Sequence, residues 1–256
     1  MGSNLFGAEP ESFCPENYRT KKAGVEYGKT EHLTYYSKVC ERERPVNITL
    51  PANYSADKKY PVMFFLHGYW ENENSWVDRD VVVQNLMADK KAEEMIIVHP
   101  FIYCSKTKNQ CTSFQAKEDW DAYDNIVNEI CQALLPWLKT KYSIKEGREN
   151  TAVIGFSMGG RETIYITLQR PELFGYVCAI SAAPGIVPTT DKFMTHPGQM
   201  PESEMRFADG ATEPEVFIIC CGTNDSVVGT YPKSYHELLD TNGSDHIWYE
   251  INGADH

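Results

Sequence analysis

The 256-residue sequence predicts an α/β fold with a mostly parallel central sheet and helices on both faces. Short runs of apolar and β-branched residues recur along the chain, and segments with a helical hydrophobic period separate them. Within these runs the hydrophobic residues are continuous rather than alternating, which is typical of strands covered on both faces. Alternation of strand and helix indicates parallel strands joined by helical crossovers.

Seven strands are expected in chain order, each bounded by turn-forming residues. They cover 47–50, 62–68, 95–100, 152–155, 176–181, 216–222 and 247–251. Three helices are expected between them, over 121–142, 158–169 and 231–240. The first carries one apolar stripe and a candidate kink at Pro136. The stripe consists of Ile126, Ile130, Leu134 and Leu138.

Length and composition predict a single catalytic domain over 1–256, with 42% hydrophobic and 23% charged residues. We interpret 1–44 as an N-terminal extension that packs on this domain. Residues 184–214 show little periodicity and many helix breakers, which predicts an irregular lobe near the functional site. The alternative is a surface insertion without a role.

Charge and hydropathy exclude two classes of partner. The formal net charge of −12 disfavours nucleic acid, and no apolar run approaches the roughly 18 residues of a membrane span. We therefore expect a small organic partner, no nucleic acid, no membrane and a monomer. CxxC spacing is absent from the sequence, so no metal site is expected.

Cysteines and sequons indicate a secreted protein. Cys104 and Cys111 flank a polar loop, and Cys14 could pair with Cys40, but sequence leaves the connectivity of eight cysteines open. Sequons stand at Asn47, Asn53 and Asn242. The first residues lack the features of a signal peptide, so we expect that any such segment has been removed.

The segment "GFSMG" places Ser157 between two glycines, after an expected strand and before an expected helix. This is the context of a nucleophile elbow. Gly155 and Gly159 lack Cβ atoms, so the backbone can take a sharp, strained turn that exposes the serine hydroxyl. The amides at the start of the helix favour negative charge at the same place.

A serine nucleophile requires a base and a carboxylate, and both are expected just after strands. Asp225 follows the strand 216–222, and His256 follows the last strand through a short loop that contains glycine. His32, His99 and His196 are interpreted as structural or solvent-facing. His236 lies inside an expected helix, and His246 opens a strand at the wrong edge of the sheet. The order Ser157, Asp225, His256 is the one expected of an α/β-hydrolase.

An oxyanion hole is expected from two backbone amides. Tyr69, in the turn that follows strand 62–68, would supply one, and Met158, directly after the nucleophile, the other. His67 precedes this turn and is interpreted as a residue that stabilises it.

Aromatic residues gather in loops expected at the same sheet edge, and a flat phenolic acid could stack on them. The candidates for substrate binding are Trp70, Trp76, Trp120 and Phe156. The alternative is that most of these rings anchor the core or the loops.

Four segments, "YPVMFFLHGYWENENSW", "GFSMGGRETI", "GTNDSVV" and "WYEINGADH", together resemble carbohydrate esterase family 1, the feruloyl and acetylxylan esterases related to esterase D. The resemblance covers about 45–256. It implies a secreted, cofactor-free α/β-hydrolase with the triad and oxyanion hole named above. It also implies an acyl-enzyme that releases feruloyl groups from plant cell-wall arabinoxylan.

The family continues past the histidine into a closing helix, whereas this sequence ends at His256, so we expect a further C-terminal tail. Four other functions stay open: an acetylxylan esterase, an esterase D-like thioesterase, a catalytically silent fold used for binding, and transfer of the acyl group to a sugar.

Overall fold

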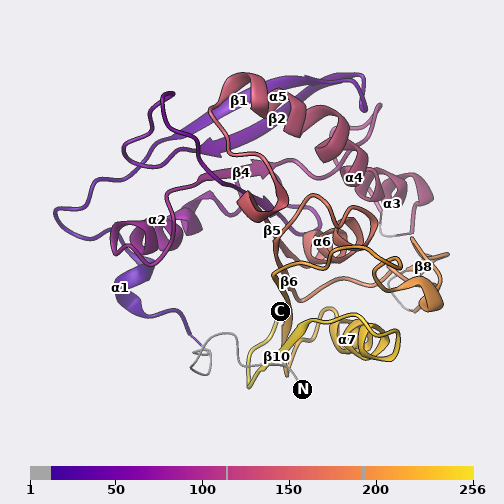
Figure 1. The fold of residues 1–256 in the computed structure, drawn as a ribbon. Helices are drawn as coiled ribbons and strands as arrows, with labels where there is room; N and C mark the ends of the chain where they lie inside the picture. The colour runs from indigo at the N-terminus through magenta and orange to yellow at the C-terminus, as the bar shows by residue number, and fades with distance from the viewer. Residues whose placement is uncertain (1–12, 114, 192–193) are drawn as a thin grey trace.

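The structure, a computed structural model, describes residues 13–113, 115–191 and 194–256. An eight-stranded sheet of order β1-β2-β4-β3-β5-β6-β9-β10 forms its centre (Figure 1). β1 pairs antiparallel with β2 and β2 with β4, and every other pair in this sheet is parallel. The strands are β1 (Thr30–Ser37), β2 (Arg42–Thr49), β3 (Val62–Leu66), β4 (Ile96–Pro100), β5 (Thr151–Phe156), β6 (Tyr176–Ile180), β9 (Val216–Gly222) and β10 (Ile247–Ile251).

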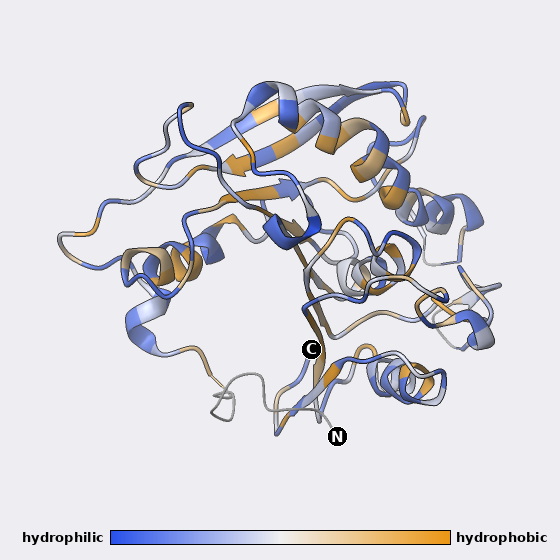
Figure 2. Cartoon of the chain, viewed as in Figure 1, coloured by the Kyte–Doolittle hydropathy of each residue, from blue (hydrophilic) through white to orange (hydrophobic). Residues whose placement is uncertain are grey.

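Helices cover both faces of the sheet, which confirms the predicted fold class (Figure 1). α1 (Glu16–Arg19) and α2 (Asp80–Ala88) lie on one face. The other face carries α3 (Lys117–Asp124), α4 (Ile126–Asn128), α5 (Leu135–Lys141), α6 (Met158–Gln169) and α7 (Tyr231–Thr241). Short 3-10 turns are η1 (Val77–Arg79), η3 (Arg148–Asn150) and η4 (Glu202–Glu204). Figure 2 shows hydrophobic residues concentrated in the central strands, where the core lies.

The first strand was not expected from sequence. Residues 1–44 were predicted to pack on the domain as an extension. Within the described part of this segment, residues 30–37 instead form β1, a strand of the central sheet. β1 is an edge strand in which exposed, half-buried and buried side chains are mixed, so it lacks the continuous apolar run of the central strands.

The predicted long helix is interrupted by one turn of π-helix, η2 (Glu129–Leu134). Pro136 has no N–H to bond to the carbonyl of Gln132, and the wider turn ends just before it. The predicted apolar stripe is confirmed, because all four of its side chains are fully buried: Ile126, Ile130, Leu134 and Leu138.

The segment 184–214 contains the two-residue strands β7 (Thr189–Thr190) and β8 (Thr195–His196) and otherwise irregular backbone. Several of its apolar side chains, including Ile186, Met205 and Phe207, belong to the hydrophobic core. The segment is therefore packed into the molecule rather than attached to its surface.

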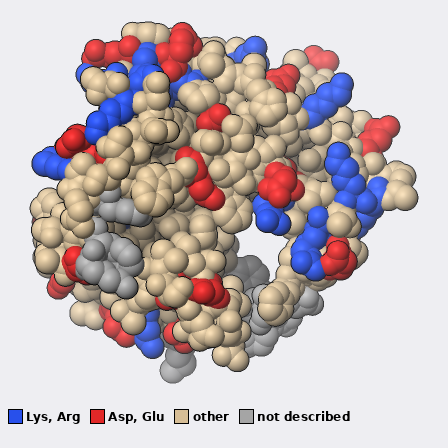
Figure 3. Space-filling view, turned by 180° about the vertical axis from the view of Figure 1, so that it is seen from behind, with Lys and Arg blue, Asp and Glu red and all other residues tan. Residues whose placement is uncertain are grey.

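Charged side chains of both signs are interspersed on the described part of the face in Figure 3. Within the residues that the structure describes, no helix has the length and apolar composition needed to cross a membrane.

Neither cysteine pairing considered from sequence is present, because all eight cysteines are free thiols in this structure. Cys14 is exposed while Cys40 is buried, and Cys111 contacts the hydroxyl of Tyr69. Cys104 lies close to Cys40, in the β1–β2 turn, with the two sulfur atoms within 4.8 Å of each other.

Candidate active site

Ser157 lies on the turn between β5 and α6, with φ 55° and ψ −113°, so the predicted strained turn is confirmed. The two flanking glycines are required by space. A Cβ at Gly159 would lie 2.1 Å from the carbonyl oxygen of Leu66, and one at Gly155 would lie 2.1 Å from that of Gly159. The elbow therefore fits against β3 only without side chains at these positions.

The structure brings together the three side chains predicted to act as a triad. Nε2 of His256 lies 3.0 Å from Oγ of Ser157, and Nδ1 of His256 lies 2.9 Å from Oδ2 of Asp225. Ser157 is 8% exposed, and the Asp225 carboxylate is buried. Because the carboxylate contacts Nδ1, that nitrogen carries the proton and Nε2 is free to accept one from the serine.

The Asp225 carboxylate is held by its own loop. Its Oδ1 accepts hydrogen bonds from the amides of Val227 at 3.0 Å and Val228 at 2.9 Å. Burial raises the pKa of Asp225, but the hydrogen bonds from His256 and from the Val228 amide outweigh this effect and lower the pKa below its usual value. Asp225 therefore stays ionised at neutral pH.

Asp255 was not predicted as a site residue, although it holds the backbone at His256. Its Oδ1 accepts from the Ser226 amide at 2.7 Å, the Ser226 hydroxyl at 2.9 Å and the His256 amide at 2.9 Å. These bonds join the loop after β10 to the loop that holds Asp225. The only sequence signal was a carboxylate adjacent to the expected histidine.

His67 stabilises the turn after β3, as predicted. Its Nε2 accepts a hydrogen bond from the Ile102 amide at 3.0 Å, so its Nδ1 carries the proton and donates to the Gly68 carbonyl at 2.7 Å. Burial lowers the pKa of His67 to about 4. The ring is neutral, and it ties the turn to the loop after β4.

Ser157 opens onto a mainly apolar cavity of about 290 Å³. The predicted residues Trp70, Trp120 and Phe156 line it, with Trp70 64% exposed at its mouth. Tyr69 and Met158 also line it, but their backbone roles stay predictions. The remaining lining residues are Gly68, Glu71, Ala183, Pro184, Met194, Val227, Val228 and His256. Pro184 and Met194 belong to the segment 184–214.

Trp76 is not among the residues that line this cavity, and its contact with substrate stays a prediction. Its ring stacks on Phe65 at 5.2 Å and packs against Phe156 at 5.0 Å, behind the cavity wall. Its Nε1 donates to Glu71 Oε2 at 2.9 Å, and the same carboxylate accepts from the Gly68 amide. Trp76 thus supports the cavity wall. Glu71, which was not predicted from sequence as a site residue, organises the turn after β3.

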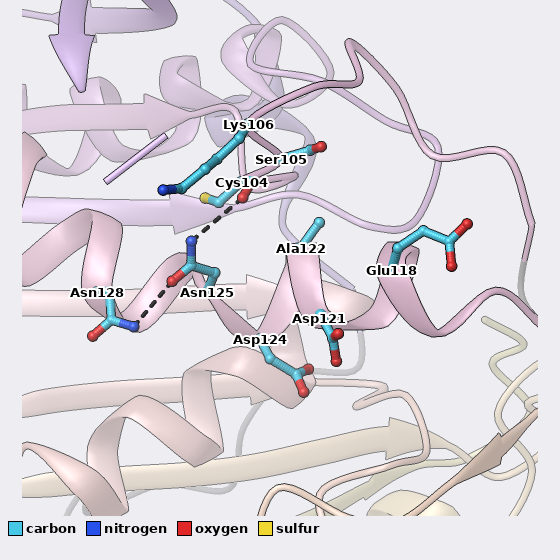
Figure 4. A pocket seen from close by; sticks show the side chains of 9 residues that line it. All are labelled: Cys104, Ser105, Lys106, Glu118, Asp121, Ala122, Asp124, Asn125 and Asn128. Atoms are coloured by element: carbon cyan, nitrogen blue, oxygen red, sulfur yellow. Dashed lines mark hydrogen bonds between the residues drawn. The ribbon is translucent and has the colours of Figure 1, made fainter. Parts of the chain in front are cut away.

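A second, polar hollow of about 470 Å³ lies beside α3 (Figure 4). Its lining includes Asp121, Asp124 and Asn125 from the helix side and Cys104 and Lys106 from the loop after β4. None of the predicted site residues lines it.

Comparison with known proteins identifies the family. The Esterase family model, described as "Putative esterase", matches residues 37–215. A ferulic acid esterase of carbohydrate esterase family 1 from Anaeromyces mucronatus, solved with ferulic acid, is 46% identical. The superposition has a TM-score of 0.90 and covers 97% of this chain and 92% of that one. The chain belongs to carbohydrate esterase family 1. The resemblance predicted from sequence is thereby confirmed.

One further sequence relative and one further solved structure are also similar to this chain. An endo-1,4-beta-xylanase/feruloyl esterase from Xylanibacter ruminicola is 29% identical over 170 residues, which are 63% of this chain but 22% of the relative. The chain thus spans less than a quarter of that relative's length. A feruloyl esterase module from Clostridium thermocellum shares the fold, with 21% identity, a TM-score of 0.70 and coverage of 95% of this chain and 86% of that one.

Proposed function

We propose that this family member is a secreted serine esterase that hydrolyses feruloyl esters of plant cell-wall arabinoxylan through an acyl-enzyme. One observation carries the proposal: an unbroken hydrogen-bond chain runs from Ser157 through His256 to Asp225 at an apolar cavity. The 46% identical Anaeromyces enzyme, solved with ferulic acid, supports the choice of acyl group.

In the first half of the reaction, Oγ of Ser157 attacks the ester carbonyl carbon while Nε2 of His256 takes the hydroxyl proton. Asp225 keeps Nδ1 of His256 protonated and stabilises the imidazolium that forms. The amides of Tyr69 and Met158 are the proposed donors to the tetrahedral oxyanion. Its collapse breaks the ester bond, and His256 gives its proton to the departing sugar oxygen.

In the second half, a water molecule replaces the sugar. His256 Nε2 takes a proton from this water, whose oxygen attacks the carbonyl of the feruloyl-serine. Collapse of the second tetrahedral intermediate returns the proton to Ser157 Oγ and releases the free acid. The same three side chains therefore serve both halves, and the proposal requires no cofactor.

The acyl group is proposed to lie in the cavity between Trp120 and Phe156. Both side chains are apolar walls next to Ser157, and Met194 extends the apolar surface. A planar phenolic ring buries more apolar area there than an acetyl group, so feruloyl esters should be preferred.

Secretion is proposed on the cysteine content and the sequons, although the sequons at Asn47, Asn53 and Asn242 differ in exposure. Asn47 is buried and donates to the Glu73 carbonyl at 2.9 Å, and Asn242 donates to the Glu202 carbonyl at 2.7 Å. Asn53 is exposed. Of these three asparagines, Asn53 is therefore the best placed to accept a glycan.

The test compares wild type with Ser157→Ala on methyl ferulate and on matched acetyl esters. We expect wild type to favour ferulate and the variant to lose about 10⁴- to 10⁶-fold in kcat, because an alanine cannot form the acyl-enzyme. A fluorophosphonate probe should label wild type and not the variant.

The alternatives give different results. Faster release of acetate than ferulate would favour an acetylxylan esterase, and preference for thioesters an esterase D-like enzyme. Absence of probe labelling with a folded protein would indicate a silent binding fold. An acylated sugar as main product, in the presence of excess acceptor, would indicate acyl transfer.

A further inference from the structure

Two cysteines far apart in the sequence meet in the core, away from the triad. Cys40 lies in the turn between β1 and β2, and Cys104 in the loop after β4. Their sulfur atoms lie within 4.8 Å of each other and of a Glu129 carboxylate oxygen. Cys40 is 0% exposed and Cys104 is 2% exposed. Neither thiol takes part in the proposed reaction.

The backbone on both sides of the pair is fixed. The Cys104 amide donates to the Ala122 carbonyl at 2.8 Å, and Asn125 Nδ2 donates to the Cys104 carbonyl at 3.4 Å (Figure 4). From the hairpin side, Arg44 Nη1 on β2 donates to the Tyr103 carbonyl at 2.6 Å. The loop and the hairpin are therefore held against each other where the two sulfurs meet.

Glu129 and Arg44 are the charged residues beside the pair. Glu129 accepts hydrogen bonds from Tyr35 and Ser37, each at 2.6 Å, and Arg44 Nε lies 3.8 Å from it. Arg44 Nη2 also donates to Cys104 Sγ at 3.3 Å. The carboxylate already has its partners, and a guanidinium occupies the space beside the sulfurs, which disfavours a metal ion held by Cys40, Cys104 and Glu129.

We propose that Cys40 and Cys104 form a disulfide that fastens the β1–β2 hairpin to the loop preceding α3. The bond forms by exchange with an external disulfide, such as oxidised glutathione. The Cys40 thiolate attacks one sulfur of that disulfide and releases a thiolate. The Cys104 thiolate then attacks the Cys40 sulfur of the mixed disulfide and releases the second thiolate, so two protein thiols are oxidised and one external disulfide is reduced.

In the folded chain the environments of the two thiols differ. The hydrogen bond from Cys104 lowers the pKa of the Cys40 thiol, burial opposes this, and the charge of Arg44 lowers it further. Burial raises the pKa of Cys104. Because both are shielded in the folded chain, exchange occurs before the hairpin has packed, and the finished bond resists reductants.

A second pair of neighbouring thiols provides a contrast. Cys178 on β6 and Cys220 on β9 also interact, but Cys178 is opposite Ile218 and Cys220 is opposite Ile180. The two cysteines are thus on adjacent strands and two residues out of register. Strand spacing and rise place their Cα atoms roughly 8 Å apart, beyond the limit of about 7 Å for a disulfide. We expect this pair to stay reduced.

Peptide mapping tests the proposal. The full-length chain is folded in a glutathione redox buffer, denatured, alkylated without reductant and digested. We expect one cross-linked peptide pair joining Cys40 and Cys104, two hydrogens lighter than the separate peptides, with the other six cysteines alkylated. Alkylation of all eight, or a link between other cysteines, would overturn the proposal.

Thermal melting separates a covalent bond from simple packing of thiols. Cys40→Ser and Cys104→Ser should each melt about 10 °C below oxidised wild type, because the bond closes a long loop. Wild type reduced in denaturant and refolded under reducing conditions should melt like these variants. Cys178→Ser keeps the Cys40–Cys104 pair, so its oxidised form should melt close to oxidised wild type, and reduction should lower its melting temperature by the same amount as in wild type. If reduced and oxidised wild type melt together, the bond does not form.

Discussion

The hydroxyl of Ser157 is available to His256 because the elbow removes it from its usual role at a helix start. A serine at this position ordinarily accepts a hydrogen bond from an amide of the first turn. In α6 the Ser157 side chain makes no such bond. The Gly159 amide donates instead to the His67 carbonyl at 3.0 Å, so the end of β3 caps the helix. A backbone carbonyl thus caps the helix, and the Ser157 hydroxyl remains available to bond to His256.

At the same scale, Asp255 is predicted to position the base without touching the substrate. Asp255→Ala removes the acceptor of three hydrogen bonds from Ser226 and His256 and loosens the ring that must face Ser157. We expect kcat on methyl ferulate to fall by about 10- to 100-fold, since small displacements of a catalytic group have effects of this size. Steady-state kinetics measures this.

Asp209→Ala is the matched control, because Asp209 is a mainly exposed carboxylate paired with Arg206 at 2.6 Å, with no contact to the triad. It should leave kcat within about 2-fold of wild type, as distant surface changes usually do. Equal kcat values for Asp255→Ala and wild type would contradict the positioning role.

Helices and strands with a clear hydrophobic pattern in the sequence were predictable. Elements whose structure depends on packing against other parts of the chain were not. α6 was expected over 158–169 and occupies Met158–Gln169, because a strand, an elbow and a helical period follow one another there. β1 was missed because its residues carry mixed polarity at a sheet edge. The packing of Trp76 on Phe65 and Phe156 was not predictable either, because sequence does not show which side of a loop faces the cavity.

Between α6 and α3, a buried charge network is predicted to hold the wall of the cavity. Arg161 is fully buried, its Nε donates to Glu162 at 2.8 Å, and its Nη2 contacts Asp124. Its guanidinium lies 5.3 Å from the ring of Trp120. Arg161→Met leaves the buried carboxylate of Glu162 without its cation, so we expect a loss of roughly 3–5 kcal/mol in the free energy of unfolding. Urea denaturation measures it.

The double variant Arg161→Met/Glu162→Gln separates charge from packing. It removes the charges of the buried pair together, so it should recover a substantial part of the stability lost in Arg161→Met. A single variant as stable as wild type would show that the network does not contribute to folding.

For the whole molecule, the triad was predictable because each of its members follows a strand of the same sheet. Parallel strands end at one edge, so Ser157, Asp225 and His256, each expected just after a strand, were expected to meet at that edge. The cavity is different, since Trp120 comes from α3 and Met194 from the segment 184–214. Their positions depend on long-range packing, for which the sequence carries no periodic signal.

The stability of the whole molecule is predicted to fall in acid partly through His67. Its pKa is about 4 in the folded chain against 6.5 ordinarily, so the unfolded chain binds a proton more readily between these values. The neutral ring of His67 makes its full contribution to the free energy of unfolding above pH 6.5, and this contribution is lost as the pH falls to about 4. The difference of pKa corresponds to about 3 kcal/mol in the free energy of unfolding. Urea denaturation at pH 7, 5.5 and 4 measures it.

His67→Gln isolates this contribution, because every other titrating group is common to both proteins. Between pH 7 and pH 4, the free energy of unfolding of the variant should fall by about 3 kcal/mol less than that of wild type, whatever the stability of the variant at pH 7. The ring carbon chemical shifts of His67 in wild type give an independent reading and should remain those of a neutral imidazole at pH 5. Parallel pH profiles for the two proteins, or a ring that protonates near pH 6.5, would show that the folded chain does not exclude the proton from this position.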